Sequence, residues 1–299
     1  MAHQHNHSHQ TGNYNKAFGF GIALNIIYIV VEVVYGLLIN SMALLADAGH
    51  NFSDVLGLIL AWGGAYLAKT AVTKSRTYGL RKSTILAALF NAIILLIAVG
   101  AITIEAIRKI AEPEPIGGTT MMIVAGVGVV INTLTALLFL KGREKDLNIK
   151  GAFLHMAADA GVSLGVVAAG FLINLTGFYL LDPIISLVIV VVITIGTWGL
   201  LRDSFHLSMD AVPRDIDFEK VQNYLSSIDG VKEIHDLHIW AMSTTETALT
   251  VHLVIPEEIK NDKFLSKVCG QLHHKFGIEH STIQIEKNAQ SASCENENV

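Results

Sequence analysis

Six apolar stretches dominate the sequence, each near the roughly 20 residues that a helix needs to cross the hydrocarbon core of a bilayer. They cover residues 17–39, 41–68, 83–107, 119–140, 151–173 and 178–201. With 52% apolar and only 16% charged residues, the 299-residue chain does not fit an ordinary water-soluble protein. We therefore expect an all-α domain of six transmembrane helices over residues 16–207.

The lysine and arginine residues around these stretches predict the orientation of the helices. Eleven of them lie before the first stretch, in the loops after the second and fourth stretches, or after the sixth, whereas Arg108 and Lys109 are the two on the opposite side. Basic residues in short loops favour the cytoplasmic side. Both termini are therefore predicted to be cytoplasmic.

The composition changes after the sixth stretch to that of a water-soluble domain, predicted over residues 208–287. The apolar pattern predicts, in order, a helix, two strands, a helix and a strand, at 217–227, 231–241, 247–255, 261–276 and 281–286. This order indicates a small α+β fold with its helices on one face of an antiparallel sheet. Residues 1–15 and 288–299 are too polar to form a core and are predicted to be a flexible leader and a disordered tail.

Charge and cysteine content exclude several classes of protein. The net charge of −5 leaves no basic excess to neutralise a phosphate backbone, so nucleic acid is not an expected partner. Two cysteines, Cys269 and Cys294, cannot build a disulfide framework, which suits a reducing compartment.

Ionisable residues inside the predicted membrane helices are the sharpest functional signal, because such groups are costly in hydrocarbon and seldom occur there without a role. The second stretch contains Asp47, His50 and Asp54, and the fifth contains His155 and Asp159. A spacing of three or four places residues on one face of a helix. The pattern His-x-x-x-Asp thus occurs twice, and two such faces turned toward each other would present two imidazoles and two carboxylates.

This donor set suits a divalent metal ion. Two nitrogens and two oxygens match the tetrahedral geometry of Zn²⁺, whereas Ca²⁺ and Mg²⁺ prefer more oxygen ligands. The competing interpretation is that the groups hydrogen-bond between helices as structural contacts. For Asp47 the roles of ligand, group behind the ligands, entry residue and purely structural residue all stay open.

A metal site alone does not separate transport from catalysis or sensing. A catalytic zinc keeps an open position beside a general base, and the HExxH pattern of metalloproteases is absent from the sequence. Four protein ligands close the shell, which favours an ion that is bound and released as helices move. The alternatives are a membrane metalloenzyme or a sensor with a structural zinc, and an exporter of another metal such as Co²⁺, Cd²⁺, Mn²⁺ or Fe²⁺.

At these residues the sequence resembles the cation diffusion facilitator family, and within it the bacterial cobalt, zinc and cadmium resistance type. The resemblance rests on SMALLADAGHNFSD at 41–54, TYG at 77–79, LHMAAD at 154–159 and DLHIW at 236–240. It implies that His50, Asp54, His155 and Asp159 form the transport site and that Zn²⁺ is exported in exchange for protons. A homodimer and a bacterial inner membrane are implied in the same way.

The resemblance also extends to the cytoplasmic domain, which is similar to the metallochaperone-like, ferredoxin-like terminal domain of the family. It implies metal positions at His235, His252 and Glu286, with His280 as a fourth, where Zn²⁺ would act as a regulatory ligand between subunits. The competing interpretation is that these are surface histidines that bind nothing.

Two features of the family are missing from the sequence, and one further histidine-rich segment is present. Arg76 and Leu80 stand where some members carry loop histidines, and residues 141–150 contain no histidine. In the leader, histidines alternate with other polar residues at His3, His5, His7 and His9, a pattern that predicts weak metal collection near the cytoplasmic side.

Overall fold

In the computed structural model, the structure describes residues 14–140, 147–256 and 263–288. The chain forms two compact units, and the ends of three long helices belong to the second. The first unit contains the described residues up to Leu58 together with 93–198, and the second contains 59–92 and the described residues from Gly199 onward.

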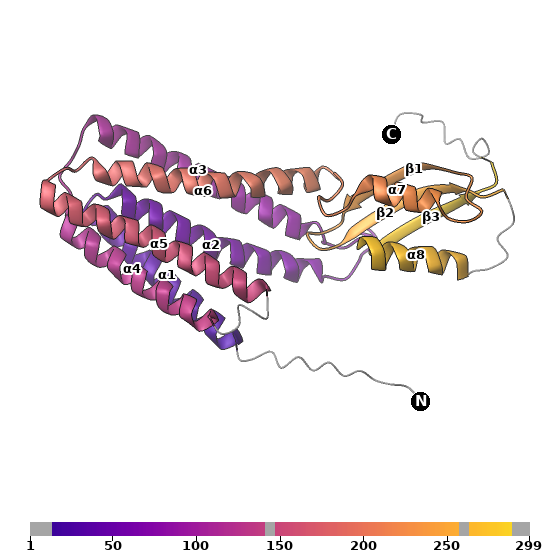
Figure 1. Ribbon diagram of the computed structural model, residues 1–299, viewed down its shortest axis with the longest axis horizontal. Helices are drawn as coiled ribbons and strands as arrows, with labels where there is room; N and C mark the ends of the chain where they lie inside the picture. The colour runs from indigo at the N-terminus through magenta and orange to yellow at the C-terminus, as the bar shows by residue number, and fades with distance from the viewer. Residues whose placement is uncertain (1–13, 141–146, 257–262, 289–299) are drawn as a thin grey trace. The chain divides into compact units, whose positions relative to one another are not determined.

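Six long helices match the six apolar stretches in order (Figure 1). They are α1 (Tyr14–Leu38), α2 (Met42–Ala68), α3 (Ser83–Ala111), α4 (Gly118–Phe139), α5 (Leu147–Thr176) and α6 (Leu181–Ser208). Four segments are long and apolar enough to cross a membrane: Ser83–Ala111, Gly118–Leu138, Phe153–Thr176 and Leu181–Ser208. In α1 the apolar part among the described residues, Ala23–Leu38, is shorter, and α2 carries the polar residues. The helical membrane domain is confirmed, whereas the number of six spans stays a prediction.

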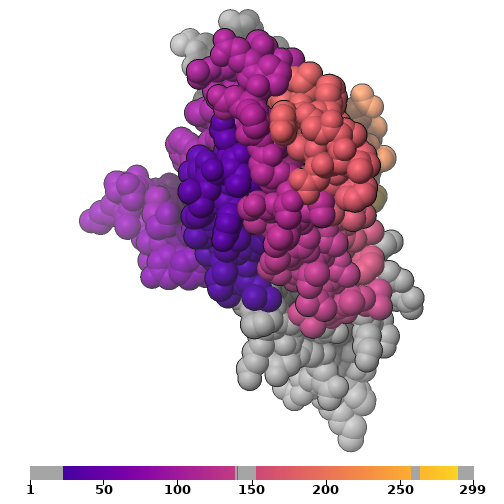
Figure 2. Space-filling model, turned by 90° about the vertical axis from the view of Figure 1, so that its left-hand side faces the viewer, coloured from indigo at the N-terminus to yellow at the C-terminus, as the bar shows by residue number. Residues whose placement is uncertain are grey.

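Within the first unit, α4 packs along α5, and α1 packs against α4. In Figure 2 the indigo segment of α1 lies beside the magenta segment of α4. Glycines allow the closest approach: a Cβ at Gly118 of α4 would lie 2.8 Å from the carbonyl oxygen of Gly170 in α5. Small residues of this kind let helix backbones meet in a membrane. The buried apolar core of this unit includes Leu44 of α2, Met121 of α4 and Val166 of α5.

The start of α2 is fixed by a carboxylate from α6. Asp182 accepts hydrogen bonds from the Ser41 hydroxyl at 2.5 Å and from the backbone N–H groups of Met42 at 2.7 Å and Ala43 at 3.1 Å. The first N–H groups of a helix have no partner within the helix, so an outside acceptor satisfies them. This contact holds in place the helix that carries Asp47, His50 and Asp54.

The second unit contains the predicted α+β domain. Its elements are α7 (Phe218–Ser226), β1 (Glu233–Ala241), β2 (Thr247–Val254), α8 (Lys263–Phe276) and β3 (His280–Glu286), each within two residues of its predicted bounds. The Asp217 side chain caps α7 by accepting from the Lys220 N–H at 3.1 Å, and contact with Lys220 lowers the pKa of Asp217.

The prediction of a wholly antiparallel sheet was wrong. The strand order is β1-β2-β3; β1 and β2 are antiparallel, but β2 and β3 are parallel. The physical reason is the connection. A parallel neighbour of β2 must begin at the same end of the sheet as β2, so the chain returns to that end through α8 before β3 begins, as in any strand–helix–strand crossover.

Both helices of this domain cover the same face of the sheet, as predicted. Leu249, Val251 and Leu253 of β2 are fully buried and pack in one core with side chains of α7 and α8. His252 alternates with them and therefore lies on the other face. The face without helices is the one that carries the histidines.

Candidate metal sites

The residues His50 and Asp54 of α2 meet His155 and Asp159 of α5. His50 Nε2 lies 3.3 Å from Asp159 Oδ1, and His155 Nε2 lies 3.2 Å from Asp54 Oδ2 and 3.7 Å from Asp159 Oδ2. Each histidine therefore contacts a carboxylate of the opposite helix. The spacing of four within each helix aligns the pair on one face, and the packing of the first unit brings the two faces together.

Three of these residues already have the spacing of metal ligands. One donor atom each of His50, Asp54 and Asp159 lie within 4.8 Å of one another. His155 stands slightly outside this group, with its ring centroid 6.2 Å from that of His50, but it touches both carboxylates. A small displacement of the His155 side chain would complete a set of two nitrogens and two oxygens, which suits tetrahedral Zn²⁺.

Burial within this four-residue cluster is graded. The Asp159 side chain is only 1% exposed, while His50, Asp54 and His155 are 20%, 29% and 43% exposed. Asp159 is therefore the innermost of the four side chains and His155 the outermost. Among the described residues, the ion-pair contacts of Asp159 are with His50 and His155, and a buried carboxylate is costly unless a positive charge balances it.

Asp47, whose role the sequence left open, lies outside the four-residue cluster. It is fully buried one turn before His50, and its Oδ2 accepts a hydrogen bond from Ser163 of α5 at 2.9 Å. The second oxygen of the same carboxylate is buried and has no hydrogen-bond partner among the residues that the structure describes. Asp47 thus stands behind the cluster and is not among the atoms gathered at ligand distance.

Sequence reasoning missed a group of buried polar residues around Asp47. Glu32 of α1 is fully buried and accepts a hydrogen bond from Asn51 of α2 at 3.2 Å, and Tyr28 lies next to Glu32. The signal was available, because Glu32 is an acidic residue in the middle of an apolar stretch.

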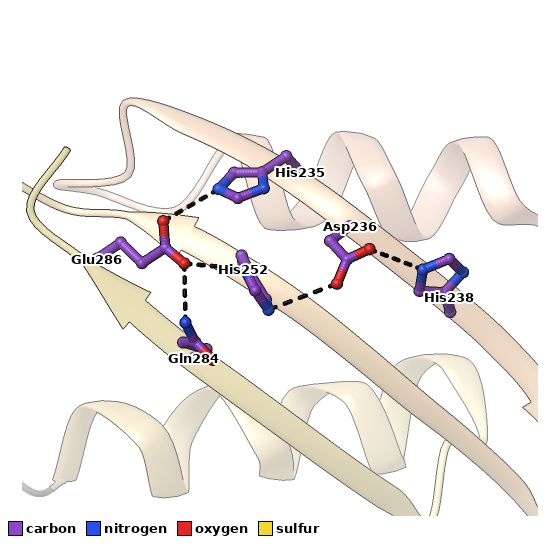
Figure 3. Close-up of polar contacts among 6 residues, drawn as sticks. All are labelled: His235, Asp236, His238, His252, Gln284 and Glu286. Carbon is purple, nitrogen blue, oxygen red and sulfur yellow. Dashed lines mark hydrogen bonds and ion pairs between the residues drawn. The ribbon is translucent and has the colours of Figure 1, made fainter. Parts of the chain in front are cut away.

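On the sheet, His235, His252 and Glu286 form a second candidate site (Figure 3). Glu286 Oε2 lies 3.2 Å from His235 Nε2, and Glu286 Oε1 lies 2.8 Å from His252 Nδ1. The strand pairing explains the meeting, because His235 of β1 stands directly opposite His252 of β2 and Glu286 ends the adjacent strand β3. Donor atoms of all three lie within 4.8 Å of one another, so the three residues could hold one ion.

A bulge in β1 adds further polar contacts beside this second site. The register shifts between His235 and His238, and Asp236 takes a left-handed backbone conformation with φ of 53°. As Figure 3 shows, the Asp236 carboxylate then lies 2.8 Å from His238 Nε2 and 3.5 Å from His252 Nε2. Asp236 therefore faces the ring nitrogen of His252 that points away from Glu286, a position from which a carboxylate orients a metal-binding imidazole.

His280 does not join the second site. Six residues of strand separate it from Glu286, about 20 Å in an extended chain. Its ring instead lies 5.6 Å from that of Tyr78, in the loop between α2 and α3. In the same loop Arg81 and Lys82 pair with Glu246 at 2.7 Å and Asp210 at 2.6 Å. The leader residues His3, His5, His7 and His9 lie outside the described residues.

The structure is that of a multi-pass membrane protein with residues that could bind cations. It combines a helical domain with several apolar spans, a small α+β domain and two clusters of residues of the kinds that ligate metals. The sequence pattern of the cation efflux transmembrane domain matches residues 20–207, and that of the cation efflux protein cytoplasmic domain matches residues 213–288. The chain belongs to this family, the cation diffusion facilitators.

Individual relatives cover nearly the whole chain. The chain is 35% identical to the cation efflux system protein CzcD of Alcaligenes sp. strain CT14, over 94% of its own length and 89% of the relative. It is 32% identical to a cadmium, cobalt and zinc/H(+)-K(+) antiporter of Bacillus subtilis strain 168, over 95% and 92%. It is 32% identical to the zinc transporter ZitB of Pectobacterium atrosepticum, over 94% and 88%.

One solved structure is similar to part of the chain. It is the metal-bound C-terminal domain of the CzcD transporter from Cupriavidus metallidurans, with 38% sequence identity and a TM-score of 0.23. The similarity covers 24% of this chain and 99% of that one.

Proposed function

We propose that this protein exports Zn²⁺ from the cytoplasm in exchange for protons, with His50, Asp54, His155 and Asp159 as the transport site. The observation that carries the proposal is the convergence of two His-x-x-x-Asp pairs from α2 and α5, with nitrogen–oxygen distances of 3.2 to 3.7 Å. Family membership agrees with transport, since relatives are described as a cation efflux protein and as a zinc transporter. Catalysis is not part of the proposal.

Metal and protons compete for the same four side chains. Zn²⁺ binds neutral imidazoles and ionised carboxylates, so the ligands lose protons as the ion enters and regain them as it leaves. Imidazoles titrate near neutral pH, which makes His50 and His155 natural proton carriers. Movement of the helices then exposes the site alternately to each side of the membrane.

The proposed topology has six membrane spans with both termini in the cytoplasm of a bacterial cell. The excess of lysine and arginine in the loops after α2 and α4 supports it. In the described structure, basic residues of the loop after α2 pair with acidic residues of the C-terminal domain, as Arg81 does with Glu246. We also propose a homodimer, because residues 213–288 match the family's cytoplasmic domain.

Zn²⁺ is preferred over the other candidate metals on chemical grounds. Two imidazoles and two carboxylates suit Zn²⁺, and Mn²⁺ or Fe²⁺ would be better served by more oxygen ligands. Co²⁺ and Cd²⁺ are closer competitors, and one relative is described as an antiporter for cadmium, cobalt and zinc.

The second candidate site supports a regulatory role for the same metal. Zn²⁺ bound by His235, His252 and Glu286 would join three strands and stabilise the form of the domain that binds it. Because an imidazole must lose its proton to bind a metal ion, occupancy would follow the cytoplasmic Zn²⁺ concentration and pH.

The transport site is tested by zinc uptake into inside-out vesicles that contain the protein, energised by a proton gradient. Asp54→Asn keeps the size of the side chain but removes a charged ligand. We expect zinc accumulation to fall by at least about tenfold, since even groups behind metal ligands change affinity by 10- to 100-fold.

Glu112→Gln is the matched control, because Glu112 is an exposed acidic residue at the end of α3. It should accumulate zinc like the unaltered protein. Unchanged uptake by Asp54→Asn would refute the site, and vesicles of the unaltered protein that bind zinc without accumulating it would refute transport in favour of a sensor or a structural zinc.

A further inference from the structure

A second polar cluster lies inside the helical unit, next to the four-residue cluster but distinct from it. Five buried residues from three helices form it, each at most 1% exposed: Tyr28 and Glu32 of α1, Asp47 and Asn51 of α2, and Ser163 of α5. We refer to these residues as the Glu32–Asp47 cluster. None of them supplies an atom to the groups that gather at metal-ligand distance among the described residues.

Hydrogen bonds satisfy one oxygen of each carboxylate. The Asn51 amide donates to Glu32 Oε2 at 3.2 Å, and the Ser163 hydroxyl donates to Asp47 Oδ2 at 2.9 Å. The two carboxyl groups are neighbours, and Tyr28 stands beside Glu32. Glu32 Oε1 and Asp47 Oδ1 are buried and have no hydrogen-bond partner among the described residues.

Two adjacent carboxylates in such a place cannot both carry a charge without a counter-charge. Buried ions that lack partners cost several kcal/mol or more, and two carboxyl groups that share a site hold a proton between them. Among the described residues, no basic side chain forms an ion pair with Glu32 or Asp47. A proton needs no cavity, and it would give both orphaned oxygens a partner.

We propose that Glu32 and Asp47 form a proton-binding pair, separate from the four metal ligands, that carries one proton of the exchange. This inference rests on the proposed zinc export. Asp47 lies one turn before His50 on α2, and Ser163, which donates a hydrogen bond to Asp47, lies one turn after Asp159 on α5, so the Glu32–Asp47 cluster shares both helices with the transport site.

The shared helices provide the coupling. The ionisable groups around the pair are Tyr28 of α1, His50 of α2 and Asp159 of α5. A divalent ion that binds beside His50 and Asp159 repels a proton held one helical turn away, because like charges repel strongly over this distance in a medium of low dielectric constant. Zinc binding therefore releases the proton, and reprotonation of the pair favours zinc release.

The test counts protons per zinc ion in proteoliposomes of the full-length protein, with a pH-sensitive dye and a zinc-sensitive dye inside. Glu32→Gln preserves the shape of the side chain and an oxygen that can accept from Asn51. We expect this variant to move about one proton fewer per zinc ion than the unaltered protein, because the pair binds as one unit. Zinc-for-zinc exchange, which requires no net proton movement, should continue.

A second substitution checks that the two residues share a single proton. Asp47→Asn should lose the same proton, and the double variant should lose no more than either single variant, since groups that act together are not additive. Glu112→Gln is the control for loss of an acidic side chain and should keep the original ratio. An unchanged ratio in Glu32→Gln overturns the proposal.

Infrared difference spectra of the unaltered protein give an answer even if a variant does not fold. Addition of Zn²⁺ should remove the C=O band of a protonated carboxylic acid, and absence of any change in that band overturns the proposal.

Two other outcomes of the transport assay have their own meaning. A variant whose transport loses dependence on K⁺ while its proton ratio stays unchanged would overturn the proposal and assign the pair to a monovalent metal ion instead. Failure of the unaltered protein to export zinc, or to move protons with it, identifies a failure of the proposed function.

Discussion

At the scale of single residues, the proposed transport site depends on a spacing of four residues within each helix. His50 and Asp54 repeat in His155 and Asp159, and this repetition separates a metal site from a single polar contact between helices. The structure adds that the histidines pair crosswise with the acids of the opposite helix. The geometry thus gives each ligand a partner that a metal ion would replace.

The identity of the donors should determine metal preference. His50→Asp replaces a nitrogen by oxygen and adds a negative charge, and carboxylate-rich sites suit Mn²⁺ better than imidazole-containing ones. We expect Mn²⁺ to compete more strongly with Zn²⁺ in this variant than in the unaltered protein, as measured by zinc uptake with increasing Mn²⁺. His273→Ala, an exposed histidine of α8, is the control. Equal competition in all three proteins would argue against His50 as a ligand.

At the scale of elements, α4 also packs tightly against α1. A side chain at Gly128 of α4 would overlap the hydroxyl group of Tyr28 in α1, whereas Gly126 of the same helix has open space around it. The absence of a side chain at Gly128 therefore allows Tyr28 to stay beside Glu32.

Substitution of the two glycines by alanine should have opposite effects. Gly128→Ala forces atoms into occupied space, which typically costs about 1–3 kcal/mol. Gly126→Ala gains helix propensity of about 1 kcal/mol without a clash. Thermal unfolding of the purified protein in detergent should show a lower melting temperature for Gly128→Ala and an equal or higher one for Gly126→Ala. A decrease of the same size in both variants would contradict the close approach of α4 and α1.

At the scale of the whole molecule, the two candidate metal sites predict two classes of bound zinc. Calorimetric titration of the full-length protein should resolve both, and His252→Ala should remove the class that belongs to the sheet while the transport class stays. Zinc at 100 times its dissociation constant would stabilise the occupied form by about 2.7 kcal/mol, so a chelator should make the C-terminal domain easier to unfold.

His273→Ala again serves as the matched control, since it removes an exposed histidine of the same domain. It should retain both classes. Loss of all zinc binding in His252→Ala, or no loss at all, would contradict two independent sites.

The sequence determined those features that depend on local periodicity. Apolar length and spacing were enough for the six helices, for the elements of the C-terminal domain and for the pairs His50–Asp54 and His155–Asp159, because each property repeats within a few residues of chain. Charge in the loops likewise predicts a membrane topology without any long-range contact, and this topology stays a prediction.

Only the tertiary structure decided which distant residues meet. The parallel pairing of β3, the contact of His280 with Tyr78, and the burial of Glu32 against Asp47 and Asn51 all join segments that are separated in the chain. A period of two or 3.6 residues shows which face of an element is apolar, but it does not show which other face covers it. Partners of that kind are selected by packing over the whole unit, so a lone acidic residue such as Glu32 acquires a role only when its neighbours are known.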